Sequence, residues 1–199
     1  MMCRMSIRRT SGRTVYENAW MVVREDQTEL ADGTAGIYGV VEKPDFALII
    51  PEDVDGALWL VEQYRYPVSG RYWEFPQGTR GRDHTVAPEE LARGELREET
   101  GFSAGRLEHI GHLFQAYGFS SQGLNVWHAT DLTPGEVERE PSEQDMRHDR
   151  FSRAEFERML QDGTIMDAST IAAYGLLLVA ERNRRAPEMP PRADDLPRH

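Results

Sequence analysis

The stretch GELREETGF, residues 94–102, decides the fold and points to the chemistry of the chain. It places Glu95, Glu98 and Glu99, here called the acidic trio, at relative positions i, i+3 and i+4, which form one face of a helix. Gly101 follows where a glycine commonly ends a helix. Three carboxylates on one face repel one another, and a hard divalent cation such as Mg²⁺ or Mn²⁺ would remove that repulsion. The stretch therefore predicts either a metal site for phosphate substrates or a solvated acidic helix face.

The surrounding sequence favours the metal site. Residues 94–102 resemble the C-terminal half of the Nudix box, which reads glycine, five residues, glutamate, seven residues, then Arg-Glu-aliphatic-x-Glu-Glu-x-Gly-aliphatic. WEFPQG at 73–78 resembles the strand and loop that lead into this box. LVEQYRYP at 60–67 and DGTIMDASTIAA at 162–173 resemble a strand and the closing helices of the ADP-ribose pyrophosphatase branch. With four blocks in the expected order, the chain is identified as a member of the Nudix family.

The resemblance implies roles for the residues of the metal site. Glu95 and Glu99 would be the principal ligands of Mg²⁺ or Mn²⁺. Glu98 would be a further ligand or a catalytic partner that orients the attacking water. A backbone carbonyl in the loop of Gln77 and Gly78 would complete the set, because hard cations prefer oxygen ligands.

The resemblance also implies a general base and substrate contacts. The base would come from the acidic loop at 140–145, where Glu143 is the first choice and Glu140 and Asp145 are the alternatives. Three further residues would contact substrate. Arg65 would bind a phosphate through its guanidinium fork, Trp73 would stack on a base or fill the core, and Tyr117 lies in the stretch where ADP-ribose enzymes often carry a proline.

The first half of the box departs from the family pattern. Counting back from Gly101, Val86 stands where the pattern has glutamate and Gly94 stands where it has arginine. In the family these two residues form a supporting ion pair. Their joint loss leaves no buried unpaired charge, which would have been the costly outcome. We expect the ligands to survive this change, with Arg93 or Arg97 as a substitute cation.

Composition restricts the class of protein. A chain of 199 residues with 39% hydrophobic residues can bury one core. The net charge of −11 argues against nucleic acid as a partner. No apolar run reaches the roughly 18 residues of a membrane span. The single Cys3 fits a reducing compartment. We therefore expect a cytoplasmic protein that binds neither membrane nor nucleic acid, and the resemblance implies a small nucleotide as its substrate.

The expected fold is α/β (α+β), because strands flank a helix and further strands and helices follow. The resemblance makes it the Nudix α-β-α sandwich with a mixed sheet, preceded by an N-terminal antiparallel strand segment. We predict a disordered N-terminus at 1–14, strands that pair with a second subunit in a homodimer at 15–45, a Nudix domain at 46–183 and a disordered tail at 184–199. The predicted helices are 83–100, 152–161 and 167–181.

The resemblance implies a metal-dependent pyrophosphatase. Such an enzyme would hydrolyse ADP-ribose or a related nucleoside diphosphate sugar to a nucleoside monophosphate and a sugar phosphate. Two alternatives remain open at this point. Gln77 and Tyr117 resemble dinucleoside polyphosphate hydrolases, and the departures at Val86 and Gly94 would suit a non-catalytic nucleotide-binding module.

Overall fold

The computed structural model describes residues 7–82, 86–139 and 144–185 of the chain. Its strands are β1 (Ile7–Glu17), β2 (Val22–Leu30), β3 (Ala35–Glu42), β4 (Phe46–Pro51), β5 (Leu58–Arg65), β6 (Gly70–Glu74), β7 (Gln77–Gly78), β8 (Phe102–Phe114), β9 (Gly123–Pro134) and β10 (Arg147–Phe151). Its helices are α1 (Pro88–Thr100), α2 (Arg153–Gln161), α3 (Ala168–Arg185) and a short 3-10 turn at Tyr66–Val68.

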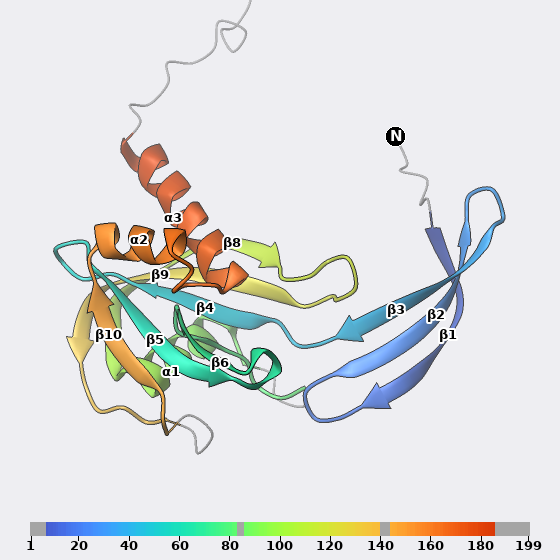
Figure 1. Ribbon diagram of the computed structural model, residues 1–199, viewed down its shortest axis with the longest axis horizontal. Coiled ribbons are helices and arrows are strands. Elements are labelled where there is room, and N and C mark those ends of the chain that lie inside the picture. The colour runs from blue at the N-terminus through green and yellow to red at the C-terminus, as the bar shows by residue number, and fades with distance from the viewer. Residues whose placement is uncertain (1–6, 83–85, 140–143, 186–199) are drawn as a thin grey trace, which may run out of the picture.

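The sandwich is organised around β4. This strand lies in a four-stranded sheet of order β7-β4-β9-β8, where it pairs in parallel with β9 and antiparallel with β7. A second sheet of order β10-β5-β6 packs in the same body. Figure 1 shows α1 on one side of these strands and α2 with α3 on the other. The predicted α-β-α sandwich with a mixed sheet is confirmed.

Two apolar clusters explain why β4 is buried on both faces. Side chains alternate across a strand, so successive residues of β4 point to opposite sides. Leu48 packs with residues of α2 and α3, including Phe156 and Leu177. Ile49 packs with Leu96 of α1 and with residues of β9. The continuous apolar run at 46–50 thus has the burial expected of a strand between helical layers.

The N-terminal strands form a separate antiparallel sheet of order β1-β2-β3 that extends away from the sandwich (Figure 1). The expected disorder at 1–14 is wrong from Ile7 onward, while residues 1–6 lie outside the described part. Every residue of β1 is exposed, so its sequence has no alternation of apolar and polar residues from which a strand could be predicted. Backbone pairing with β2 orders it instead, together with cross-strand ion pairs such as Arg8–Glu29 and Arg13–Glu25.

The helices differ from the predictions mainly at their ends. The helix expected at 83–100 begins only at Pro88, which occupies its first turn, while 83–85 lie outside the described residues. The capping box of Ser152 and Glu155 at the start of α2 is confirmed. The last helix continues to Arg185, beyond the expected end at 181, and residues 186–199 are not described. None of the helices in the described part has the length and apolar character that a membrane crossing needs.

Candidate active site

Helix α1 presents two members of the acidic trio, Glu95 and Glu99, to strand β7. The helix starts at Pro88 and ends at Thr100. It is capped by Gly101, whose φ of 78° is left-handed and whose N–H donates to the Arg97 carbonyl at 2.8 Å. A glycine accepts this conformation without strain. Within α1, the side chains of Glu95 and Glu99 are buried, with residue exposures of 6% and 0%. Two buried carboxylates one helical turn apart need positive charge or hydrogen-bond donors nearby.

Strand β7 meets both buried carboxylates. The backbone N–H of Gln77 donates to Oε2 of Glu99 at 3.1 Å. A Cβ added to Gly78 would lie 2.3 Å from Oε2 of Glu95, a distance that atoms do not tolerate. Gly78 is therefore required for Glu95 to lie against the β7 backbone. The structure brings together Glu95, Glu99, Gln77 and Gly78, all four of which the sequence assigned to the metal site.

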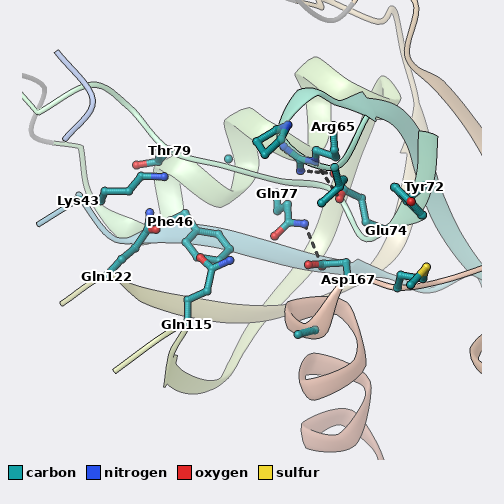
Figure 2. Close-up of a pocket in the computed structure, with 15 residues that line it drawn as sticks. Lys43, Phe46, Arg65, Tyr72, Glu74, Gln77, Thr79, Gln115, Gln122 and Asp167 are labelled. Carbon is teal, nitrogen blue, oxygen red and sulfur yellow. Dashed lines mark hydrogen bonds and ion pairs between the residues drawn. The ribbon is translucent and has the colours of Figure 1, made fainter. Parts of the chain in front are cut away.

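A pocket of about 580 Å³ opens next to this strand. Gln77 and Gly78 line it, and Figure 2 shows the labelled side chains around it. Its other lining residues are Lys43, Phe46, Arg65, Pro67, Val68, Tyr72, Glu74, Thr79, Gln115, Gln122, Met166, Asp167 and Ala168. The mixture of aromatic, apolar, amide and cationic groups is suited to a small polar molecule with an anionic part.

Arg65 lies at one end of the pocket, where it forms an ion pair with the buried Glu74. Burial alone would lower the pKa of the Arg65 guanidinium, but the carboxylates of Glu74, Glu99 and Asp167 outweigh burial and raise it. Burial raises the pKa of Glu74 above its ordinary value, despite the opposing effect of Arg65. Gln63 also donates to Glu74 at 2.7 Å. Glu74 and Gln63 thus hold Arg65 at the pocket wall.

Lys43 lies at the other end, beside Thr79 and Gln122 in Figure 2. It is the only lysine of the chain, whose other 22 basic residues are arginines. Among the described residues its ammonium group has neither an ion pair nor a hydrogen bond. A half-buried cation without a counter-ion on a pocket wall can bind an anionic group of a ligand. Lys43 does not belong to any motif that we recognised in the sequence.

Asp167 links the pocket to the closing helix. Its Oδ2 accepts from the Gln77 side-chain amide at 3.1 Å, and from the backbone N–H and the hydroxyl of Thr170, each at 2.8 Å. Because Asp167 precedes the first residue of α3, these bonds satisfy donors at the helix start. The side chain of Gln77 is thereby fixed toward α3 while its backbone N–H faces Glu99.

The donor set fits a hard divalent cation. Glu95 and Glu99 supply buried carboxylate oxygens, and a Cβ at Gly78 would fill the place where the Glu95 carboxylate meets the β7 backbone. In the ranges 7–82, 86–139 and 144–185, no three acidic, histidine or cysteine side chains converge on one point. A cation here would thus be held by two carboxylates, with backbone carbonyl and phosphate oxygens as further ligands.

The sequence also predicted roles for Glu98 and Trp73, and neither residue lines the pocket. Glu98 forms an ion pair with Arg80 at 2.7 Å. Trp73 packs edge-on against Phe151, with ring centroids 4.9 Å apart, and does not line the pocket. Its neighbour Tyr72 lines the pocket instead, because adjacent strand residues face opposite sides.

The loop residues also lie apart from the pocket or outside the description. Tyr117 is 84% exposed and is not part of the pocket wall. Glu140 and Glu143 lie outside the described residues, so Glu143 as the general base remains a prediction. Asp145 forms an ion pair with Arg71.

Known proteins resemble this chain over most of its length. The nucleoside diphosphate sugar hydrolase N-terminal domain matches residues 7–41, and the NUDIX domain matches residues 42–172. An ADP-ribose pyrophosphatase of Mycobacterium tuberculosis is 33% identical over 171 residues, which cover 85% of this chain and 81% of that protein. The ADP compounds hydrolase NudE of Escherichia coli is 27% identical over 84% of this chain and 88% of NudE.

A solved structure agrees with this relationship. The crystal structure of an ADP compounds hydrolase superposes with a TM-score of 0.80, covering 93% of this chain and 99% of that one, at 22% identity. At this identity the superposition establishes the shared fold, while the domain matches establish the family. The chain therefore belongs to the Nudix family and is a hydrolase similar to the ADP-ribose pyrophosphatases.

Proposed function

We propose that this Nudix hydrolase cleaves the phosphoanhydride bond of ADP-ribose or a related nucleoside diphosphate sugar in a Mg²⁺- or Mn²⁺-dependent reaction. One water is consumed, the P–O–P bond breaks, and the products are a nucleoside monophosphate and a sugar phosphate. The observation that carries the proposal is the pocket itself, which is lined by Gln77 and Gly78 and has a basic side chain at each end, Arg65 and Lys43. The Mycobacterium tuberculosis relative named ADP-ribose pyrophosphatase supports the substrate class.

The residues of the pocket have complementary tasks in this reaction. Arg65, held by Glu74, binds one phosphate of the diphosphate, and Lys43 binds an anionic group toward the other end. The amides of Gln115 and Gln122 are placed to accept and donate hydrogen bonds with sugar hydroxyls. Tyr72 and Met166 supply apolar surface for a nucleobase or sugar ring.

Glu95 and Glu99 hold the divalent cation against β7. When bound, the cation offsets the negative charge of the diphosphate and makes the attacking water more acidic. Glu143 remains our proposed general base. Glu98 remains our proposed further ligand or partner that orients the attacking water, whereas the predicted roles of Tyr117 and Trp73 in substrate binding receive no support from their positions.

We also propose that the enzyme is a cytoplasmic homodimer in which β1–β3 contact a second subunit. This sheet extends from the sandwich and carries exposed apolar side chains, including Val15, Ile37 and Tyr38. Residues 7–41 match the nucleoside diphosphate sugar hydrolase N-terminal domain, which supports treating this sheet as a segment distinct from the NUDIX domain. The single cysteine supports a reducing compartment.

A hydrolysis panel tests the substrate assignment. Purified protein with Mg²⁺ or Mn²⁺ is incubated with ADP-ribose, other nucleoside diphosphate sugars and dinucleoside polyphosphates, and products are separated by chromatography. The proposal predicts the highest kcat/KM for a nucleoside diphosphate sugar, with a nucleoside monophosphate as product. A preference for dinucleoside polyphosphates would favour the alternative substrate class, and no turnover of any compound would refute the proposal.

A further inference from the structure

The two departures from the Nudix box lie at one place on the surface. Val86 and Gly94 border the same hollow beside α1, and Arg80 borders it too. The NH2 group of Arg80 would lie 3.5 Å from a Cβ added to Gly94, which is an ordinary contact distance. The guanidinium of Arg80 therefore lies directly over the helix position where the family pattern has an arginine.

Arg80 is directed at one member of the acidic trio. Its NH2 group is 2.7 Å from Oε1 of Glu98, and the two side chains are 33% and 16% exposed. Oε1 of Glu98 would also lie 3.6 Å from a Cβ on Gly94. Any side chain longer than alanine at position 94 would thus compete with the Arg80–Glu98 pair for the same space.

The two arginines expected to replace the missing cation are engaged elsewhere. Arg93 pairs with Glu89 at 2.9 Å and donates to the carbonyl of Ala104 at 3.0 Å. Arg97 pairs with Glu138 at 3.5 Å, and both of those side chains are about half exposed or more. Neither is paired with Glu98 in the part of the chain that the structure describes. The expectation that Arg93 or Arg97 supplies the substitute is therefore wrong.

We propose that Arg80 is the positioning residue for Glu98 and supplies from the loop after β7 the cation that a box arginine would supply from position 94. This inference rests on the proposed function, because orienting Glu98 matters only beside a working metal and substrate site. The loop also explains the sequence change at position 94, since glycine there leaves room for a guanidinium that arrives from outside the helix. Arg80 acts through Glu98 and is not assigned a contact with the substrate.

The proposal predicts two effects of Arg80→Ala. Loss of a residue that orients a metal-site carboxylate typically lowers metal affinity or activity by roughly 10–100-fold. We therefore expect the Mn²⁺ dissociation constant, measured by calorimetry without substrate, to rise by about tenfold or more. We expect kcat to fall by a similar factor while KM for the preferred substrate changes less than about twofold. Arg97→Ala, which removes a surface cation of helix α1, should change neither the Mn²⁺ dissociation constant nor kcat.

Two further variants make the test specific. In an Arg80→Ala, Gly94→Arg double variant, an arginine returns to the helix position, and we expect Mn²⁺ affinity and kcat to recover most of the loss. In a Glu98→Gln background, Arg80→Ala should add no further loss, because residues that act through one another are non-additive. An equal further loss in that background, or unchanged Mn²⁺ affinity in Arg80→Ala, would overturn the inference.

The Mn²⁺ titration separates this inference from the proposed function. If the wild-type protein hydrolyses none of the panel compounds but Arg80→Ala weakens Mn²⁺ binding and Gly94→Arg restores it, the positioning inference stands and the proposed function falls. If the wild-type protein hydrolyses a nucleoside diphosphate sugar and Arg80→Ala behaves like wild type in both measurements, the inference falls and the function stands. Thermal unfolding of each variant establishes that the protein is folded.

Discussion

The backbone N–H of Gln77 and Oε2 of Glu99 are 3.1 Å apart, and the hydrogen bond between them joins β7 to α1 across 22 residues of chain. It fixes the deepest carboxylate of the acidic trio, whose residue exposure is 0%. The same backbone segment continues to Gly78, against which Glu95 lies. One short strand therefore positions both buried carboxylates.

Glu99→Gln should abolish most activity without unfolding the protein. Glutamine has nearly the same shape, and its carbonyl oxygen can still accept from Gln77, but it removes the charge that holds a divalent cation. We expect kcat to fall on the order of 10²-fold or more. The matched control is Glu89→Gln, an exposed member of an ion pair on the same helix. Full turnover in Glu99→Gln would show that the ligand assignment is wrong.

Gly78→Ala should act through Glu95. The new Cβ would lie 2.3 Å from the Glu95 carboxylate and would force it away from β7. A displacement of about 1 Å at a reacting centre can cost on the order of 10²-fold in rate, and weaker Mn²⁺ binding should accompany it. Gly118→Ala is the control, because a Cβ at Gly118 meets nothing within 4 Å. Wild-type Mn²⁺ affinity in Gly78→Ala would argue against Glu95 as a ligand.

Lys43→Ala should weaken substrate binding more than it slows turnover. A hydrogen bond to a charged group contributes about 1.5–3 kcal/mol, so KM should rise roughly tenfold or more. Lys43→Arg keeps the charge and should retain most of the affinity. Because Lys43 is the only lysine, an amine-selective reagent offers a second measurement, with peptide mapping to separate Lys43 from the N-terminal amine. Equal labelling of Lys43 with and without saturating ADP-ribose would contradict its place in the binding pocket.

Glu52 should make the fold sensitive to acid. It follows the last residue of β4 and accepts from His128 of β9 at 2.6 Å and from Arg153 of α2 at 2.8 Å, so it links the end of β4 to both elements. Burial alone would raise the pKa of Glu52, but these two partners outweigh it and lower the pKa to about 2. Its contribution is therefore complete above its ordinary pKa of 4.5 and is lost as the pH falls toward 2.

The Glu52→Gln variant measures this contribution. The lowered pKa corresponds to at most about 3 kcal/mol in the free energy of unfolding at pH 7. Denaturant unfolding at several pH values should show that the difference from wild type shrinks between pH 4.5 and about 2. Glu29→Gln, which removes a surface pair with Arg8, should show a small difference at every pH. A constant difference for Glu52→Gln across this range would contradict the linkage.

The N-terminal sheet should hold two subunits together. Ile37 is 66% exposed on β3, so Ile37→Asp places a charge in the proposed interface. Sedimentation velocity should show a wild-type dimer and a shift of Ile37→Asp toward monomer. Val54→Asp, on an exposed turn of the sandwich, should leave the dimer intact. A wild-type protein that sediments only as a monomer would refute the proposed homodimer.

The family resemblance was sufficient to predict the sandwich, and local signals in the sequence were sufficient to predict most of α1. The apolar run at 46–50 identified a buried strand, and Gly101 marked the C-terminal end of the helix, whereas its start was predicted at 83, five residues before Pro88. Strand β1 escaped prediction because none of its residues is buried and its order depends on pairing with β2. Hydrophobic periodicity carries no information about such a strand.

The residues that we propose as metal ligands could be identified from the sequence, but most of the residues that line the pocket could not. The spacing of Glu95 and Glu99 within one helix is a local property, and Gln77 and Gly78 lie in a stretch that resembles the family. The positions of Lys43 at the pocket and of Arg80 against Glu98 result from contacts between segments that are distant in the sequence. Neither residue lies in a recognisable motif. Adjacent residues of a strand point to opposite faces. Tyr72 faces the pocket, and its neighbour Trp73 therefore faces away from it.

The central claim is that Glu95 and Glu99 hold a divalent cation beside the pocket. Its most direct test is a crystal structure of the protein with Mn²⁺ and a non-hydrolysable ADP-ribose analogue, with an anomalous difference map that locates manganese. The account predicts an anomalous peak within bonding distance of Glu95, Glu99 and a β7 carbonyl oxygen, with the diphosphate of the analogue between that peak and Arg65. Clear density for the analogue in the pocket with no manganese at Glu95 and Glu99 would contradict it.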